Sequence, residues 1–156
     1  MINYLTKRLF VILTIATLTI VTGIFAGGKI ANADSAGQSE NYDKMYSVAK
    51  SKLGTPYAYG STGPSSFDCS GFTQYVYRAG NKNIARTAQA QYNTTKKVSK
   101  ANRQKGDLVY FGYSKRSISH VGIYIGNGKM INAQNRGVIV ENVSSPWWHS
   151  VGYSRP

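Results

Sequence analysis

The stretch Asp68-Cys69-Ser70-Gly71-Phe72 holds the only cysteine in a chain of 156 residues. Apolar residues follow it at the spacing of an amphipathic helix: Phe72, Tyr75, Val76 and Ala79. We therefore predict a helix that begins at about Cys69 and ends at Gly80. A thiol in the first turn of a helix feels the positive end of the helix dipole, which favours the thiolate. The alternative is a buried and inert thiol, and the local pattern alone does not decide between the two.

A second candidate residue lies far downstream. His120 opens the apolar run from residue 121 to residue 125, which predicts a strand. A cysteine at a helix start and a histidine on a strand form the pair that a thiol hydrolase needs. Exported proteins usually contain paired cysteines, so a sole cysteine in such a protein indicates a reactive thiol or an intermolecular disulfide.

The N-terminus predicts export. Lys7 and Arg8 precede an uncharged apolar stretch from Leu9 to Ala26, and Ala31-Asn32-Ala33 is a small-x-small cleavage site. We therefore expect a signal peptide over residues 1–33. The alternative is an uncleaved membrane anchor, because residues 9–26 approach the roughly 20 residues that span a bilayer.

The rest of the chain suits one domain without disulfides. We expect residues 34–41 to form a short flexible tail, because their composition is polar, and residues 42–156 to form a single domain. Nothing in the sequence indicates association, so a monomer is expected.

The charge is strongly positive, with 19 Lys and Arg against 6 Asp and Glu, a net +13. Such a chain is attracted to polyanions, which outside a bacterial cell are anionic wall polymers or anionic lipids. No nucleic-acid-binding motif is present, so nucleic acid is not an expected partner. One run of basic residues contains no acid, and we interpret it as a solvated loop in preference to a specific site: Lys96, Lys97, Lys100, Arg103 and Lys105.

The periodicity predicts helices first and antiparallel strands afterwards, which is an α+β domain. The expected helices are 42–53, 69–79 and a short one from the cap Thr87 to Tyr92. The expected strands are 107–111, 120–125, 129–133, 138–143 and an edge strand at 151–153.

One hairpin decides the geometry of the site. Gly126-Asn127-Gly128 separates two of the expected strands, and a three-residue loop there places Gly122 opposite Asn132. His120 and Asn132 then become diagonal neighbours on one face, and the amide can orient the imidazole. A two-residue loop would shift the register by one and put them on opposite faces. The alternative role for Asn132 is a polar residue on an exposed face.

With these residues identified, the chain resembles the NlpC family of bacterial cell-wall cysteine peptidases. The resemblance covers about Tyr42 to Arg155, and no single motif carries it. The motifs occur in family order: Gly54-Thr55-Pro56-Tyr57, Phe67 to Phe72, Arg86-Thr87 with Gln91, Gly106 to Phe111, His120 to Gly126, and Met130 to Ala133. It implies a papain-like α+β fold with N-terminal helices packed on an antiparallel sheet.

The resemblance also implies the site residues. Cys69 would be the nucleophile and His120 the general base and then the general acid. The third, orienting residue of the family is often histidine, and Asn132 stands at that position here. An amide can orient the imidazole but cannot stabilise imidazolium as a carboxylate would. We expect activity to survive this departure.

Three further residues receive roles by analogy with the family. The hydroxyl of Tyr57 and the backbone N–H of Cys69 would stabilise the oxyanion. Asp68 and Ser70 would hold the substrate amine, as in some relatives. A plain helix cap is an equal alternative for Asp68.

The implied activity is a thiol endopeptidase that cuts peptidoglycan stem peptides between γ-D-glutamate and the following diamino acid. No metal or cofactor is expected, because His149 is the only other histidine and no zinc-ligand set is recognisable. For Trp147 and Trp148 we prefer core packing over a groove rim. The alternatives are an amidase of the CHAP type, a non-catalytic cationic wall-binding protein, and a transferase that uses the same thioester.

Overall fold

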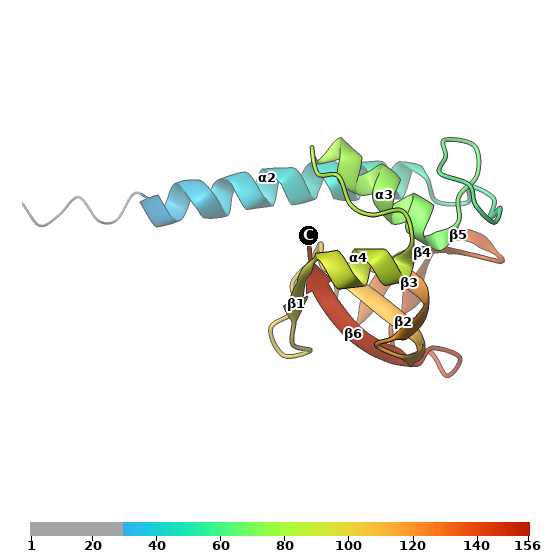
Figure 1. The fold of residues 1–156 in the computed structure, drawn as a ribbon. Coiled ribbons are helices and arrows are strands. Elements are labelled where there is room, and N and C mark those ends of the chain that lie inside the picture. The colour runs from blue at the N-terminus through green and yellow to red at the C-terminus, as the bar shows by residue number, and fades with distance from the viewer. Residues whose placement is uncertain (1–29) are drawn as a thin grey trace, which may run out of the picture. The chain divides into compact units, whose positions relative to one another are not determined.

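The computed structural model describes residues 30–156 (Figure 1). Within them the helices are α2 (Ile30–Ser51), α3 (Cys69–Ala79) and α4 (Ala88–Thr94). The strands are β1 (Lys96–Val98), β2 (Leu108–Ser114), β3 (Ser117–Gly126), β4 (Lys129–Gln134), β5 (Gly137–Asn142) and β6 (Ser150–Arg155). They form one antiparallel sheet in the order β1-β6-β2-β3-β4-β5. The expected α+β class is confirmed.

Helix α2 begins before the start that the sequence predicted. It runs from Ile30, so the tail expected at 34–41 is helical, in a stretch that contains several alanines and no proline. The compact domain comprises residues 39–156, and α2 contributes Met45 and Ala49 to its core. No helix of the described residues is long and apolar enough to cross a membrane. Most of the expected signal peptide, with its apolar stretch 9–26, lies outside the described residues.

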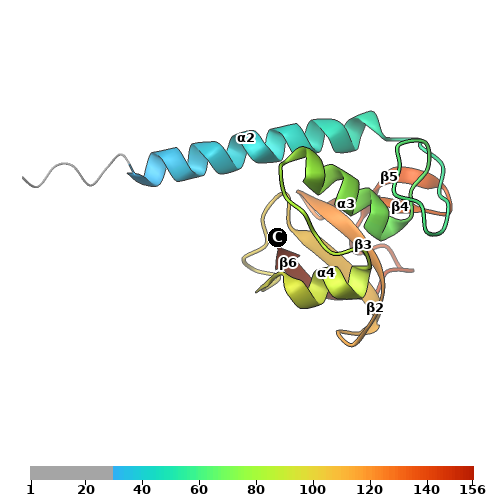
Figure 2. The same cartoon turned by 45° about the horizontal axis from the view of Figure 1, so that its top comes forward.

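Helices α3 and α4 cover one face of the sheet, with α3 against β3 and β4 and α4 against β3 (Figure 2). Both begin where the sequence predicted. The Asp68 side chain caps α3 by accepting a hydrogen bond from the N–H of Gly71, and Thr87 caps α4 in the same way. The Asp68 cap fixes the position of the first turn of α3, where Cys69 lies.

Alternation along the strands divides the core between the two faces of the sheet. Leu108 and Tyr110 of β2 pack in the cluster that α2, α3 and α4 cover. Val109 and Phe111 pack in a second cluster on the other face, together with Tyr153. The sheet therefore buries side chains on both faces, and α3 packs on one of them against β3 and β4.

The β3–β4 hairpin confirms the predicted register but not the predicted loop. Ile123 pairs with Ile131, as a three-residue loop requires. The connection is nevertheless a two-residue turn, Asn127-Gly128, closed by Gly126 and Lys129, and a bulge between Tyr124 and Gly126 restores the register. Asn127 and Gly128 have φ of 51° and 69°, the left-handed values of a tight hairpin turn, which the bulge makes compatible with the register.

Two strand regions differ from the expectation. β1 falls in the basic stretch that we interpreted as a loop, where it pairs with β6 at the sheet edge. Exposed lysines are common on edge strands because they oppose pairing with other chains, so their presence did not argue against a strand. β2 and β3 also run further toward their shared turn than predicted.

Candidate active site

Cys69 is the first residue of α3, and its side chain is partly buried. Burial and the neighbouring charge of Asp68 raise the pKa of its thiol, while hydrogen bonding from backbone groups, that of Val121 among them, acts in the opposite direction. Helix α3, which carries the thiol, packs against β3, the strand that carries His120. The pKa of the Cys69 thiol is raised overall, which is opposite to the effect expected from the helix dipole. The resting cysteine is therefore the neutral thiol.

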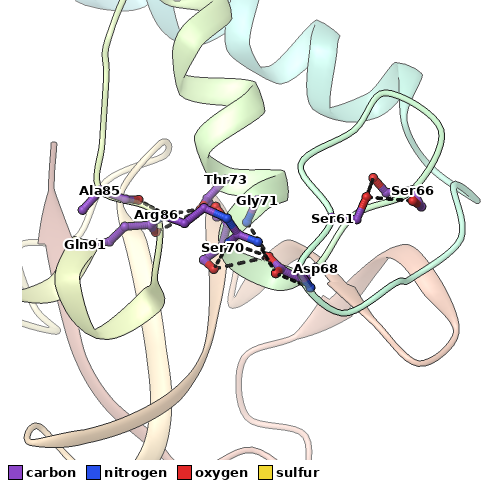
Figure 3. Close-up of polar contacts among 10 residues, drawn as sticks. Ser61, Ser66, Asp68, Ser70, Gly71, Thr73, Ala85, Arg86 and Gln91 are labelled. Carbon is purple, nitrogen blue, oxygen red and sulfur yellow. Dashed lines mark hydrogen bonds and ion pairs between the residues drawn. The ribbon is translucent and has the colours of Figure 1, made fainter.

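The carboxylate of Asp68 accepts hydrogen bonds from several donors (Figure 3). Its oxygens accept the N–H of Gly71 at 2.6 Å and the N–H of Gly60 at 3.0 Å, and they receive both terminal nitrogens of Arg86. Burial alone would raise the pKa of Asp68, but the Arg86 hydrogen bond, the Gly71 hydrogen bond and the Arg86 charge hold it below its ordinary value. Asp68 thus caps the helix and ties two loops to it.

Ser70 belongs to the same network. Its hydroxyl lies 3.3 Å from Asp68 Oδ1 and accepts a hydrogen bond from Arg86 at 2.9 Å. Behind it the buried Gln91 of α4 donates to the carbonyl oxygens of Ser70 and Ala85 and accepts from Thr73 (Figure 3). Gln91 therefore joins α3, α4 and the segment that carries Arg86.

The predicted contact between His120 and Asn132 is confirmed. The Nε2 of His120 lies 2.9 Å from Oδ1 of Asn132, and both side chains are buried. Burial lowers the pKa of His120 to about 4, although the Asn132 hydrogen bond and the Glu141 charge act to raise it. The neutral imidazole with its proton on Nε2 then donates to Asn132, which leaves Nδ1 as the basic nitrogen.

Sequence reasoning missed a carboxylate behind this pair. Glu141 of β5 is 7% exposed, and its Oε2 accepts hydrogen bonds from Nδ2 of Asn132 at 3.3 Å and from Nε1 of Trp148 at 2.8 Å. Its Oε1 accepts from Arg136 at 2.7 Å and from Nε1 of Trp147 at 3.1 Å. The amide of Asn132 thus links the negative charge of Glu141 to His120. The sequence analysis had not assigned this role to any residue.

The two tryptophans differ, and the expectation of core packing is wrong for one of them. The Trp148 ring stacks on His120, with centroids 4.4 Å apart and planes 13° apart, and it packs against Phe111. Trp147 is 64% exposed. Both line a pocket of about 510 Å³ beside His120, together with Tyr57, Gln134, Asn135 and Arg136. The loop before β6 is therefore a wall of the site.

Tyr57 is the remaining predicted residue. It lines the pocket with His120, and burial, with the nearby Cys69 next in effect, raises the pKa of its hydroxyl. The phenol is therefore a protonated donor near the thiol. Within residues 30–156 no three His, Cys, Asp or Glu side chains gather as a metal site would require.

These contacts define a class of protein. A cysteine at a capped helix N-terminus, next to a strand whose histidine is oriented by a polar side chain, is the arrangement of papain-like thiol hydrolases. Comparison with known protein families agrees, because the sequence model of the NlpC/P60 family matches residues 54–154. The chain belongs to the NlpC/P60 family, which confirms the resemblance.

Relatives and solved structures are similar over most of the chain. A "Probable endopeptidase p60" of Listeria grayi is 42% identical over 128 residues, which cover 81% of this chain and 25% of the relative. The "Bifunctional muramidase/DL-endopeptidase CwlT" of Bacillus subtilis (strain 168) is 39% identical over 124 residues, which cover 76% and 38%. The chain spans about a quarter or less of the length of the first curated relatives, 25%, 21% and 24%.

The fold is shared with solved proteins of the family. An NlpC/P60 family protein from Bacillus cereus ATCC 10987 superposes with a TM-score of 0.70 at 34% identity, over 73% of this chain and 39% of that one. The peptidoglycan hydrolase RipB from Mycobacterium tuberculosis superposes with a TM-score of 0.68 at 30% identity, over 77% and 66%.

Proposed function

We propose that the protein is a secreted peptidoglycan endopeptidase that cuts stem peptides between γ-D-glutamate and the following diamino acid. The observation that carries the proposal is the 2.9 Å contact between Asn132 and His120, which lies on β3, the strand against which the helix of Cys69 packs. It leaves His120 Nδ1 free to exchange a proton with the thiol. The names of the relatives, an endopeptidase and a DL-endopeptidase, support the same reaction.

The resting site suits a proton transfer within the Cys69–His120 pair. Because the pKa of the thiol is raised and that of the imidazole is lowered, both groups are neutral near pH 7. His120 Nδ1 takes the thiol proton as Cys69 attacks the γ-glutamyl carbonyl. The imidazolium then protonates the leaving amine, and a water activated by His120 hydrolyses the thioester. Asn132 orients the ring, and Glu141 stabilises its transient charge.

The oxyanion and the substrate amine receive their own groups in this proposal. The backbone N–H of Cys69 and the hydroxyl of Tyr57 stabilise the tetrahedral oxyanion. Asp68 and Ser70 flank Cys69 in the chain and would meet the amine of the stem peptide. Because Arg86 and two N–H groups already occupy the Asp68 carboxylate, any contact with the amine is added to its capping role.

The first experiment uses purified peptidoglycan and mass spectrometry of the released fragments. We expect fragments that end at γ-D-glutamate with the wild type and none with Cys69→Ala. The two histidines give a matched pair, because His120→Gln should abolish release whereas His149→Gln, at an exposed position, should not. Intact stem peptides freed from muramic acid would instead identify an amidase. Products joined to an added amine would identify a transferase, and wall binding without release would identify a cationic binder.

Anionic wall polymers are the second proposed partner. After α2, the acidic residues Asp68, Asp107 and Glu141 are all buried, and each forms an ion pair with an arginine. The surface of residues 44–156 therefore exposes basic side chains without an exposed acidic side chain. Such a surface attracts polyphosphate chains of the wall in a salt-dependent way.

Charge removal tests this partner. Changing Lys96, Lys100 and Lys105 to Gln should weaken binding to intact walls at low salt more than changing Lys44, Lys115 and Lys129 to Gln. Hydrolysis of a small soluble peptide should not change in either variant. Equal retention of all three proteins on walls, or no effect of stripping the anionic polymers, would contradict the proposal.

A further inference from the structure

The connection from β1 to β2, residues 99–107, is folded onto the sheet by polar contacts. Arg155 of β6 donates from Nε to Asp107 at 2.7 Å and from Nη2 to the same carboxylate at 2.9 Å. The Nη2 of Arg155 also donates to the carbonyl oxygen of Asn102 at 3.3 Å, and the N–H of Gln104 donates to Asp107 at 2.7 Å. The basic stretch that the sequence indicated as a solvated loop therefore has a fixed backbone.

Arg103 lies between this loop and two aromatic rings. Its Cζ is 5.1 Å from the ring centroid of Tyr124 and 5.6 Å from that of Tyr153. Its Nε is buried and has no hydrogen-bond acceptor within residues 30–156, so the faces of the two rings take that place. Its Nη1 donates to the carbonyl oxygen of Lys100, which leaves Nη2 for a ligand.

The sheet register places a lysine beside this arginine. Tyr153 belongs to the second core cluster, on the face of the sheet away from α3. Val98 pairs with Tyr153 and Lys96 pairs with Arg155, and directly opposed residues of antiparallel strands share a face. Because alternate residues of a strand also share a face, Lys96 and Arg155 lie on the face of Tyr153.

Positive charge gathers here without a free acid. Asp107, the one acidic residue of the loop, is 1% exposed and is paired with Arg155. Four other basic side chains take no part in the three ion pairs of residues 30–156, and we call them the basic patch: Lys96, Lys100, Arg103 and Lys105. The three lysines are exposed. A polyanion therefore meets four cations on a backbone that is already ordered, which lowers the entropic cost of binding.

The surroundings of the patch indicate which polyanion fits. Tyr124 and Tyr153 are 7% and 5% exposed, so neither offers an open ring face on which a nucleic-acid base could stack. None of the exposed large apolar side chains of residues 30–156 belongs to residues 96–107, so this region has no anchor for a lipid bilayer. A flexible chain of phosphodiester groups requires neither feature.

The patch is remote from the catalytic residues. In the sheet β6 and β2 separate β1 from β3, the strand of His120, a distance of roughly 14 Å at the usual strand spacing. Along β2, Asp107 precedes by four residues Phe111, which pairs with His120, and this adds roughly 13 Å. Helix α3 with Cys69 covers the other face.

We propose that the basic patch is a binding site for a flexible polymer of repeated phosphodiester groups, and that the bound polymer leaves the catalytic site open. The Nη2 of Arg103 donates to one phosphate, and the three lysines bind its neighbours along the chain. The inference rests on the proposed attraction to anionic wall polymers and adds to it the site and the recognised group.

The first test maps the bound polymer on the wild type. Lysine acylation is measured by mass spectrometry at low salt, with and without soluble poly(glycerol phosphate). The polymer should slow the acylation of Lys96, Lys100 and Lys105 by about threefold or more, because a bound phosphate covers each ammonium group. The exposed Lys44 and Lys129, outside the patch, are the matched controls and should react at an unchanged rate. This measurement needs no variant to fold.

The second test compares single arginine variants by titration with the same polymer. Arg103→Gln removes one charge-assisted contact, so its affinity should fall by about tenfold. Arg103→Lys keeps the charge but not the planar fork, so it should lose part of the affinity. Arg116→Gln removes the same charge at an exposed position of the β2–β3 turn, outside the patch, and should bind nearly as the wild type does.

The results also separate the site from its alternatives. Equal protection of Lys44, Lys129 and the patch lysines, or equal losses in Arg103→Gln and Arg116→Gln, would overturn the site, because the attraction would then belong to the whole surface. Tighter binding to phosphatidylglycerol vesicles or to single-stranded DNA than to the polymer would overturn the proposed ligand. Inhibition of soluble-peptide hydrolysis by saturating polymer would overturn the claim that the catalytic site stays open.

The endopeptidase proposal fails in a different way. If the polymer protects the patch lysines while the wild type releases no fragments from peptidoglycan, the endopeptidase proposal fails and the patch stands. If the wild type cleaves stem peptides while the polymer protects none of the patch lysines, the patch is overturned and the endopeptidase stands.

Discussion

Asn132 and Glu141 form a hydrogen bond of 3.3 Å between Nδ2 and Oε2, and the other end of the same amide lies 2.9 Å from His120. The carboxylate thereby decides which way the amide faces, since only Oδ1 can accept from the protonated Nε2. An asparagine at the orienting position is in this way combined with a buried negative charge. An amide alone cannot stabilise imidazolium as a carboxylate would, and the buried charge of Glu141 supplies that stabilisation through Asn132.

Glu141→Gln should therefore lower kcat on a soluble stem peptide by about tenfold, which is about 1.4 kcal/mol of transition-state stabilisation. The amide keeps a side chain of the same shape but removes the charge and leaves the orientation of Asn132 undetermined. Steady-state kinetics with the folded variant, checked by circular dichroism, measure the effect.

The matched control is Glu40→Gln, an exposed acid on α2, which should keep kcat. If Glu141→Gln kept full kcat with an unaltered pH profile, the amide would be oriented without the carboxylate. A change in KM alone would assign Glu141 to the pocket and not to the imidazole.

The pH dependence of kcat/KM should reflect the buried histidine. Because burial lowers the pKa of His120 to about 4, the imidazole stays neutral, and able to accept the thiol proton, well below pH 6.5. The acidic limb should therefore have its midpoint near pH 4. An acidic midpoint near 6.5, the value of an ordinary histidine, would mean that His120 is solvated in the working enzyme.

The same shift predicts acid sensitivity of the fold. The unfolded chain binds a proton on His120 below about pH 6.5, while the folded chain resists it down to about 4, so stability should fall as the pH is lowered through that window. Chemical denaturation at pH 7 and pH 4.5 measures the loss. His120→Gln should reduce the difference in the free energy of unfolding between pH 7 and pH 4.5, and His149→Gln should not. The same difference in both variants would refute the assignment of the effect to His120.

Local pattern and register explain what the sequence could predict. The helix at Cys69 was predictable because its cap and its apolar spacing lie within a dozen residues. The contact of His120 with Asn132 was predictable from the strand register alone, even though the expected loop was wrong.

Glu141 was missed because a single acid in an alternating strand reads as a solvent-facing residue. One signal was available: Glu141 pairs with Met130, two residues from Asn132, which makes it a diagonal neighbour of Asn132 on the same face. The stacking of Trp148 on His120 joins segments that only tertiary structure brings together.

The Asp68→Asn variant should distinguish the two roles of this side chain, as the cap of α3 and as a negative charge. The amide can still accept from Gly71 but loses the ion pair with Arg86, so we expect a loss of about 1–3 kcal/mol of stability. The pKa of Cys69 should fall, because the charge of Asp68 helps to raise it. Thermal unfolding and the pH dependence of iodoacetamide alkylation measure the two effects. Asp43→Asn, at an exposed site on α2, should change neither, and an unshifted alkylation curve in Asp68→Asn would contradict the electrostatic part.

Changing each of the two neighbouring tryptophans to Ala should affect different quantities, stability and kcat for Trp148 and KM for Trp147. Trp148→Ala removes a ring that stacks on His120 and packs against Phe111, and it deprives Glu141 of a donor, so stability should fall by about 2–4 kcal/mol and kcat should fall with it. Trp147→Ala removes an exposed ring at the pocket, and Arg136 still donates to the Glu141 oxygen that loses the Trp147 hydrogen bond, so its melting temperature should change less than that of Trp148→Ala while KM rises. Thermal melts and steady-state kinetics on one soluble peptide distinguish the two. A large stability loss in Trp147→Ala, or an unchanged kcat in a folded Trp148→Ala, would show that the roles assigned to the two rings are wrong.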